Sequence, residues 1–507
     1  MFDARFLLSY LASWCVLIST TSVAEDAVDF QSDIRPIISN HCFACHGPDQ
    51  QHREADVRLD VADEVDLDEV LARIASKDPD VMMPPPEMNK PLKAEQITTL
   101  ARWIKQGAPY EQHWAFSPAR DHAFPQTNDA GWSDQPIDRF VLAKLEAQNL
   151  RPSPRASKRT LIRRVTLDLT GLPPTLDQVD AFLADTSDEA YDKMIERLLG
   201  SPAYGEHMAR YWLDLVRFAD TNGLHHDHYR EMTPYRDWVI RSFSDNLPMD
   251  DFIIHQLAGD LLQQPTIDQQ VASGFNRLHL IIDRGTALPE ESFFRNVVDQ
   301  VSAVGTAFMG LTMQCAVCHD HKYDPITQKD FYQLSAFFNN FDGEAETGSR
   351  GSLDFRRGLQ PPYLNLPTSK QKSAIQRFES EIMRLGLEVK KLQTQQKAAV
   401  KESTKSVEAD TDQSKHAAKS QGDQRQDSEL SKELKALTAK LKNQQQARDA
   451  FMLTIPATLV MKERSEVRPA HIMIRGAYDQ PGEEVTRDVP GFLPPMKKQD
   501  GLRTRMD

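Results

Sequence analysis

The sequence contains two five-residue motifs with the pattern C-x-x-C-H: Cys42-Phe43-Ala44-Cys45-His46 and Cys315-Ala316-Val317-Cys318-His319. In such a motif two thiols can bind the two vinyl groups on one edge of a porphyrin, and the adjacent histidine can be the proximal ligand of the iron. The spacing therefore predicts haem c at both motifs. The predicted thioether attachment points and proximal ligands are Cys42, Cys45 and His46 in the first motif, and Cys315, Cys318 and His319 in the second.

A distal ligand for the first motif is predicted in the segment Val81-Met82-Met83-Pro84-Pro85-Pro86. Prolines keep such a segment extended without a helix, so a methionine before them can reach an iron with its thioether. Met83 is the preferred ligand and Met82 the alternative. Met/His ligation raises the reduction potential relative to ligation by two histidines. The competing interpretation is a surface loop in which the methionine only packs.

The second motif has no obvious distal ligand. His321 is two residues from the proximal His319 and cannot easily reach the opposite face of a porphyrin. The other candidates are His255, His279 and the cluster from His225 to His228. An open sixth position would permit chemistry on a small molecule. Alternatively, Cys315, Cys318, His319 and His321 have the side chains of a structural zinc site.

The composition limits the class of protein. The chain has 507 residues, a net charge of −14 and a pI near 5.6. This length predicts two to four domains, and the acidic balance argues against nucleic acid as a partner. There is no glycine-rich phosphate loop, G-x-S-x-G elbow or H-E-x-x-H motif, so no motif supports phosphate chemistry or hydrolysis.

The N-terminal residues 1–24 have the features of a signal peptide. Arg5 precedes an apolar run, and Ser22 and Ala24 occupy the small-residue positions of a cleavage site. The run is short for a membrane span, so we expect membrane attachment only if the leader stays uncleaved. Export to the periplasm or cell envelope agrees with the two motifs, because c-type haem is attached outside the bacterial cytoplasm.

Helical periodicity and breaks in composition predict a mainly α-helical chain. We expect a small c-type cytochrome domain, a larger helical domain, a coiled-coil helical hairpin and a short C-terminal extended segment. The predicted parts are a signal peptide (1–24), a cytochrome c-like domain (25–115), a linker (116–135), a helical domain that ends in the second motif (136–341), a second linker (342–369), the hairpin with a disordered tip (370–452) and the incomplete start of a further domain (453–507).

Several long motifs resemble one family of proteins. Near the first haem motif they are Asn40 to Asp49, Arg58-Leu59-Asp60, Met83-Pro84-Pro85-Pro86 and Arg102 to Ala108. This segment resembles the planctomycete-type cytochrome c domain. Further motifs resemble the uncharacterised helical domain that follows it: Pro136 to Phe140, Arg163 to Pro174, Trp212-Leu213-Asp214, Ala219 to Gly223, Tyr235 to Ile240, Gln256 to Asp260 and Cys315 to Ile326. The resemblance implies a fold and a haem cofactor, and it implies no substrate.

The stretch Leu224-His225-His226-Asp227-His228 departs from that resemblance. Three histidines and an aspartate could bind zinc or copper, or one histidine could ligate the second iron. A solvent-exposed loop with histidines that do no chemistry is the simpler interpretation.

Two heptad patterns predict the helical hairpin. The apolar positions are Ile375, Phe378, Ile382, Leu385, Val389 and Leu392 in the first helix, and Leu430, Leu434, Leu437, Leu441 and Phe451 in the second. Between them, about 397–428, lies a Lys-, Gln-, Ser- and Asp-rich stretch that we expect to be disordered. The hairpin could pack on itself, on a partner or on a second copy of the chain.

Three functions are consistent with these features. The first is single-electron transfer by an exported dihaem cytochrome to an unidentified redox partner protein. The second is a dihaem oxidoreductase with a catalytic second haem, whose pocket could be lined by Asp214, Arg217, Asp220, Asn222, Arg236 and Asp237. These residues could equally be helix caps and surface pairs. The third is a monohaem cytochrome fused to a zinc-bound scaffold or binding domain.

Overall fold

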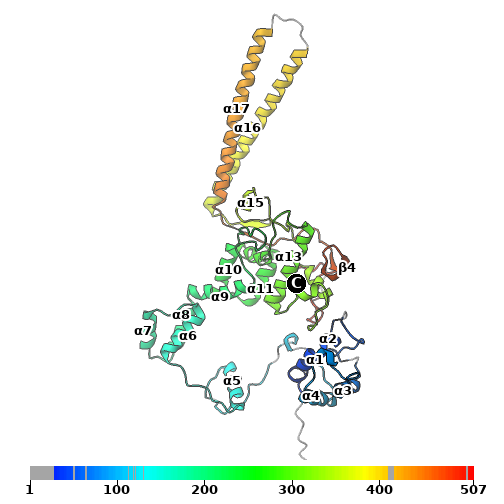
Figure 1. Ribbon diagram of the computed structural model, residues 1–507. Helices are drawn as coiled ribbons and strands as arrows, with labels where there is room; N and C mark the ends of the chain where they lie inside the picture. The colour runs from blue at the N-terminus through cyan, green and yellow to red at the C-terminus, as the bar shows by residue number, and fades with distance from the viewer. Residues whose placement is uncertain are drawn as a thin grey trace, which may run out of the picture. The chain divides into compact units, whose positions relative to one another are not determined.

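The computed structural model describes residues 28–49, 52–62, 65–111, 114–117, 119, 121–129, 131–408, 416–497 and 501–507 (Figure 1). The predicted signal peptide therefore lies outside the described residues. The described part contains 17 α-helices and only two small two-stranded sheets, which confirms a mainly α-helical protein. None of the described helices combines the length and the apolar character needed to cross a membrane.

The chain divides into two compact units. The first contains the described residues up to His122 together with 320–325, and the second contains 123–319 and 326–507. The elements of the first unit are η1 (Phe30–Ile34), α1 (Arg35–His41), α2 (Phe43–His46), α3 (Leu67–Ala75), η2 (Pro86–Met88), α4 (Ala94–Lys105) and η3 (Trp114–Phe116).

One apolar cluster holds the first unit together. Phe43, Trp103, Ile34 and Leu100 are almost fully buried in it. The Trp103 ring lies 5.7 Å from that of Phe30, and its indole N–H donates to the carbonyl of Pro109 at 3.1 Å. The apolar positions of α4 recur at helical spacing, so one face of this helix covers the short helix that carries the first haem motif.

The helices of the second unit follow the periodicity of the sequence closely. They are α5 (Pro136–Ala147), α6 (Lys158–Thr170), α7 (Leu176–Ala184), α8 (Ala190–Leu199), α9 (Pro202–Leu215), α10 (Thr233–Ser244), α11 (Met249–Ala258), α12 (Ile267–Ala272), α13 (Pro289–Val304), α14 (Gln328–Ser335) and α15 (Leu353–Arg356). Thr175 caps α7 by accepting the backbone N–H of Gln178, as its position before the apolar run predicts.

The two stretches predicted as a linker and as a further domain belong to the core of the second unit. Strand β1 (Tyr363–Asn365) pairs antiparallel with β2 (Ala457–Leu459), and β3 (Ala470–Met473) pairs with β4 (Pro481–Val485). Leu359, Leu459 and Val485 are buried in the same cluster as the residues of α10 and α13. The predicted boundaries at 342–369 and 453–507 therefore differ from the structure. Strands β1 and β2 are separated in the sequence by the whole hairpin, so no local pattern indicates that they pair.

A buried arginine joins these distant segments. Arg277 is fully buried, and its guanidinium donates to the carbonyls of Pro362 at 2.8 Å, Val460 at 3.0 Å and Gln360 at 3.2 Å. It also lies 4.6 Å from the centre of the Phe341 ring. Burial and the nearby charge of Arg230 lower the pKa of Arg277 to about 9, which still leaves it charged at neutral pH.

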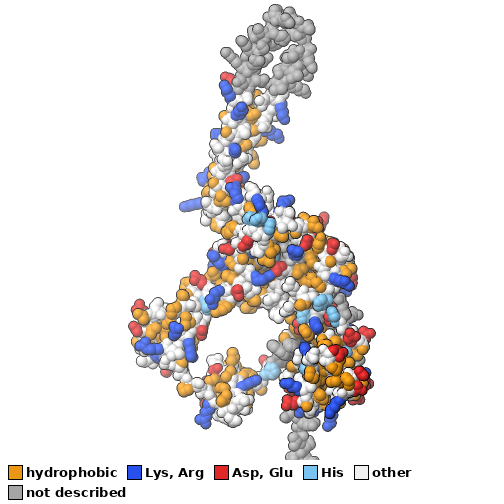
Figure 2. All heavy atoms as spheres, in the orientation of Figure 1, with side chains coloured by type: hydrophobic (Ala, Val, Ile, Leu, Met, Phe, Trp, Pro, Cys, Tyr) orange, Lys and Arg blue, Asp and Glu red, His pale blue; other side chains and the backbone are white. Residues whose placement is uncertain are grey.

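The predicted hairpin is formed by α16 (Ser369–Glu408) and α17 (His416–Met452), which pack side by side (Figure 1). Leu385 is fully buried, and the rings of Phe378 and Phe451 lie 5.7 Å apart, in line with the predicted apolar seam. Lysine and arginine side chains project along its described surface (Figure 2). Both helices extend into 397–428, which we expected to be disordered; its alanines, lysines, glutamines and glutamates are good helix formers.

Candidate haem sites

The first motif lies on a single helical turn. Helix α1 ends at Cys42, and the backbone N–H groups of Cys45 and His46 both donate to the Cys42 carbonyl, at 3.1 and 2.8 Å. Gly47 ends α2, and a Cβ at this position would lie 2.5 Å from the Phe43 carbonyl oxygen. Only glycine therefore allows the chain to leave the helix so close to the motif.

The loop that follows the motif supports it through the backbone. The N–H of Glu54 donates to the carbonyl of Cys45, and the N–H of Leu59 donates to the carbonyl of His46, each at 2.8 Å. These two carbonyls at the end of α2 have no partner within the helix. The loop thus satisfies them, and the buried Leu59 fixes it against the core of the first unit.

Two ionisable groups of this motif, Cys42 and His46, have pKa values shifted by burial toward the neutral form. Burial, together with the neighbouring Cys45, raises the pKa of Cys42 to about 12. Burial also lowers the pKa of His46, although the carbonyls of Val57 and Glu54 oppose this shift. The buried Nδ1 atom of His46 has no hydrogen-bond partner among the described residues. A neutral imidazole is the form that ligates a metal.

Met83 belongs to the same core as the motif. Its side chain packs on the apolar cluster of the first unit, as that of Cys42 does. Its N–H donates to the carbonyl of Arg73 near the end of α3 at 3.2 Å, while the N–H of Met82 donates to the Asp78 carbonyl at 2.8 Å. The two thiols and the imidazole of the motif, with the thioether of Met83 on the same apolar cluster as Cys42, fit the donor set of haem c.

The second motif has a different structure. Cys315 lies on the short 3₁₀ helix η7 (Gln314–Val317), and both Cys315 and Cys318 are exposed. The motif is attached to α14, because the Val317 carbonyl accepts hydrogen bonds from the Tyr332 hydroxyl at 3.0 Å and from Nε2 of Gln328 at 2.9 Å. Exposed thiols beside a fixed backbone leave room for a bulky group on the surface.

The C-terminal segment contacts the second motif, which the sequence did not predict. Gly476 has a φ of +71°, and a Cβ at this position would lie 2.7 Å from Sγ of Cys318 and 3.1 Å from Cγ1 of Val317. Gln328 joins the two segments by donating also to the carbonyl of Met473 at 3.2 Å. No local pattern near residue 476 could have indicated this contact.

The residues proposed for a zinc site in the second motif do not converge in the structure. Cys315, Cys318 and His319 are not among the described groups whose ligand atoms lie within 4.8 Å of one another. Nδ1 of His321 accepts the backbone N–H of Asp324 at 2.9 Å and lies 3.4 Å from the carboxylate of the same residue. A zinc ion here would therefore require a rearrangement of the motif.

The candidate distal ligands of the second motif have other partners or surroundings. His255 lies 3.2 Å from the amide nitrogen of Gln269. His279 is buried, and its pKa is lowered well below the usual value by burial and by the charges of Arg277 and Arg230. His225, His226 and His228 gather around Asp283.

The polar residues expected to line a pocket are used in separate local contacts. Arg217 forms an ion pair with Asp299, and Arg236 pairs with the adjacent Asp237 at 2.8 Å. The backbone of Asn222 bonds to His228 and to Ile281 at 2.9 and 3.0 Å. These contacts agree with the simpler interpretation of this group as structural residues.

A cavity that the sequence did not predict lies between α13, α14 and β3. Its volume is about 560 Å³, and its lining includes Phe294, Val298, Tyr332, His471 and Met473. Tyr332 connects it to the second motif through the hydrogen bond to Val317. A smaller cavity of about 270 Å³ shares Phe294 and Val298 and is lined also by Gln314 and Val317.

Comparison with known proteins identifies two domains. Residues 42–87 match the family model described as Planctomycete cytochrome C, which covers the first motif and Met83. Residues 136–343 match the family model described as Protein of unknown function (DUF1549), which covers the second motif. The order of the two matches is the order predicted from the sequence. No curated protein and no solved structure matches this chain.

Proposed function

We propose that this chain, whose residues 42–87 match the planctomycete cytochrome c model and whose residues 136–343 match DUF1549, is an exported dihaem cytochrome that transfers single electrons. The first haem is the better supported of the two. Its support is a single observation: Cys42 of the C-x-x-C-H motif and Met83 pack on the same apolar cluster, within the segment that matches the cytochrome family.

In the first unit, Cys42 and Cys45 would hold haem c through thioether bonds, His46 would be the proximal ligand and Met83 the distal ligand. Haem c supplies reversible one-electron exchange at its iron. The loop from Glu54 to Leu59 keeps the imidazole in place by its hydrogen bonds to the carbonyls of the motif. The buried Phe43 and Trp103 exclude water from the core, which would favour the less charged oxidation state of the haem.

In the second unit, Cys315, Cys318 and His319 would hold a second haem. The motif is fixed to α14 by the Val317 carbonyl, and its thiols are exposed and accessible to attachment. The cavity of about 560 Å³ beside α14 favours a second candidate function, a dihaem oxidoreductase that acts on a small molecule in the second unit. Low-spin, six-coordinate iron in the second haem would favour electron transfer, and high-spin, five-coordinate iron would favour catalysis.

Export, the redox partner and self-association also belong to this proposal. Residues 1–24 would be removed during export, so protein recovered from the periplasm should begin near residue 25. The partner would be another redox protein, and the hairpin of α16 and α17 could associate with a second copy of the chain.

The haem content tests the proposal. The full chain would be expressed in a host with c-type maturation, and covalent haem would be counted by intact mass and a pyridine haemochrome spectrum. We expect two haems in the wild type and one in each of two double variants, Cys42→Ser with Cys45→Ser and Cys315→Ser with Cys318→Ser. One haem in the wild type, located on Cys42 and Cys45, would reduce the protein to a monohaem cytochrome. Absence of haem would refute the proposal.

Met83 is tested separately. Met83→Ala should keep the covalent haem but convert the first iron to a high-spin spectrum, because the thioether is its proposed sixth ligand. Met82→Ala is the matched control and should leave the spectrum unchanged. The reverse result would assign the distal ligand to Met82.

A further inference from the structure

The loop that contains the three adjacent histidines is tightly folded. Thr221 and Tyr229 form an antiparallel bridge, and the backbone N–H of Asn222 donates to the carbonyl of His228 at 2.9 Å. His225 and Asp227 both have left-handed backbone conformations, with φ of +56° and +49°. Non-glycine residues adopt this conformation rarely, and it occurs most often where a side chain has a specific position to occupy.

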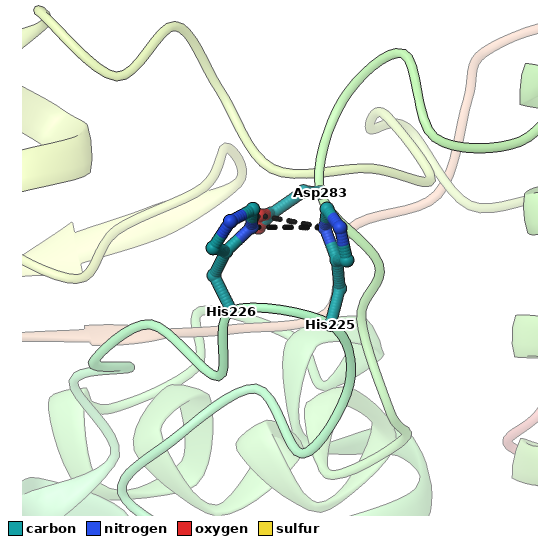
Figure 3. Close-up of side chains that lie close together, drawn as sticks. All are labelled: His225, His226 and Asp283. Atoms are coloured by element: carbon teal, nitrogen blue, oxygen red, sulfur yellow. Dashed lines mark hydrogen bonds and ion pairs between the residues drawn. The ribbon is translucent and has the colours of Figure 1, made fainter.

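The histidines converge on a carboxylate from another part of the chain. Nδ1 of His226 lies 2.7 Å and Nδ1 of His225 lies 3.1 Å from Oδ2 of Asp283 (Figure 3). Nε2 of His228 lies 3.3 Å from the same oxygen. Asp283 is 57 positions from His226 in the sequence, and its side chain is only 2% exposed. Histidine side chains gather on the surface of the second unit near the base of the hairpin (Figure 2).

Hydrogen bonds alone do not account for this arrangement. Oδ2 of Asp283 is approached by three imidazoles and by Nη2 of Arg350 at 3.0 Å, although one carboxylate oxygen has only two lone pairs. Its other oxygen, Oδ1, is buried and has no partner among the described residues. Nε2 of His228 is also buried, and its 3.3 Å contact with Oδ2 is not a hydrogen bond, so it too lacks a hydrogen-bond partner among the described residues. The two Nδ1 atoms of His225 and His226 face each other at 3.0 Å.

Only one of the two aspartates near the histidines joins the group. Asp227, the aspartate within the histidine loop, does not join the group, because its carboxylate accepts the backbone N–H of Gly223 at 2.6 Å.

We propose that His225, His226 and Asp283 bind a Zn²⁺ ion, with water as the fourth ligand. Ligand atoms at about 2.0–2.1 Å from a tetrahedral zinc lie about 3.3–3.4 Å from one another. The ligand atoms of these three residues lie 2.7, 3.0 and 3.1 Å apart and need to open by only a few tenths of an ångström. His228 contacts Oδ2 of Asp283 at 3.3 Å but lies outside this group of three. Two imidazoles with a single carboxylate suit zinc better than calcium or magnesium, which prefer several oxygen ligands, and the set has no thiolate for Cu(I).

The site can accept an ion from solvent. The side chains of His225 and His226 are 40% and 51% exposed, so one side of the group is open. Arg350 has to move, because its Nη2 lies 3.0 Å from Oδ2 of Asp283 and 3.1 Å from Nδ1 of His226. Its side chain is 59% exposed and can turn into water. The ion would then join two loops, 221–229 and 281–286, that the backbone already links through the N–H of Ile281 and the carbonyl of Asn222.

Zinc titration of the haem-loaded full chain, after removal of metal by a chelator, tests the proposal. We expect one Zn²⁺ per chain that depends on the histidine group, measured by isothermal titration calorimetry and by metal analysis after dialysis. Asp283→Asn and His226→Gln should each weaken binding at least about tenfold. His122→Gln removes an exposed histidine elsewhere and should have no effect. Zinc bound anywhere outside the histidine group is common to all variants and cancels in the comparison.

Two outcomes would overturn the proposal. One is equal zinc affinity in the wild type, Asp283→Asn and His226→Gln. The other is a changed haem spectrum in His226→Gln, which would assign the histidine to iron instead. If Asp283→Asn fails to fold because its side chain is buried, His226→Gln keeps the test intact, since that side chain is half exposed. Zinc should also slow hydrogen exchange in residues 221–229 of the wild type and not in His226→Gln.

Discussion

The two C-x-x-C-H motifs have the same spacing and opposite surroundings. The residue after the first cysteine is Phe43 in one motif and Ala316 in the other, and Phe43 is one of the main buried side chains of its unit. The first motif forms an α-helical turn with both thiols partly buried, whereas the second forms a 3₁₀ turn with both thiols exposed. The spacing of the motif therefore fixes the attachment chemistry but not how deeply the cofactor is built into the fold.

This difference has a consequence for stability. The small first unit has one apolar cluster, and its haem motif is part of that cluster. The second unit has a larger core formed by α9 to α14 and the C-terminal strands, to which its motif contributes only the small side chains of Ala316 and Val317. We expect changes at the first motif to unfold its unit, and changes at the second to have mainly local effects.

Truncation of a buried side chain between the two cysteines of each motif should show the largest contrast in stability. Phe43→Ala removes a side chain that is 2% exposed and should lower the free energy of unfolding of the first unit by about 3–5 kcal/mol. Val317→Ala should cost the second unit about 1–2 kcal/mol. Hydrogen exchange resolved by unit, in increasing denaturant, would measure both. Val81→Ala, at a site 41% exposed, is the control and should cost under about 0.5 kcal/mol. Equal losses for Phe43→Ala and Val317→Ala would remove the contrast.

The reactivity of the thiols gives a second contrast. In chain produced without haem attachment, the pKa of about 12 leaves Cys42 about one part in ten thousand thiolate at pH 8. Cys315 and Cys318 are exposed to the reagent. Alkylation by iodoacetamide, followed by peptide mass spectrometry, should therefore modify these two at least about a hundredfold faster than Cys42. Similar rates would mean that the first motif is not buried before haem is attached.

The local elements of this fold were readable from the sequence. Helix α8 (Ala190–Leu199) follows apolar residues at helical spacing, and Thr175 caps α7, because apolar spacing and capping residues are local signals. The haem motifs were equally readable, since their chemistry requires a fixed spacing along the chain. The ligand role of Met83 stays a prediction, which rests on the prolines that fix the shape of its loop.

The long-range parts were not readable. Strand β2 returns to pair with β1 only after the whole hairpin, and neither strand alternates over enough residues to indicate a partner. Arg277 is fully buried, although arginine is normally exposed, because three carbonyls from distant loops surround its guanidinium. In the proposed metal site the histidines were visible as a cluster, whereas Asp283 was not, because a single carboxylate in an irregular loop carries no pattern.

The contact between Gly476 and the second motif can be tested by a matched pair of variants. Gly476→Ala places a Cβ 2.7 Å from Sγ of Cys318 at a φ of +71°, while Gly310→Ala has a similar φ of +64° and open space around it. Both pay about 1–2 kcal/mol for the left-handed conformation. Gly476→Ala should lose a further 1–3 kcal/mol or so from the close contact. Denaturant unfolding of the second unit measures the difference, and equal losses would show that the C-terminal segment does not support the motif.

The smallest predicted effect is an acid response of the unit that carries the second motif. His279 is buried and neutral, with its pKa well below the usual value because of burial, Arg277 and Arg230. The unfolded chain binds a proton near pH 6.5 that the folded chain does not, so stability falls as the pH falls below this value. Between pH 7 and pH 6 the loss should be about 0.7 kcal/mol. His279→Gln should remove this component from the pH dependence of the urea midpoint, and exposed His122→Gln should not. An unchanged pH dependence in His279→Gln would mean that the acid response arises from other groups.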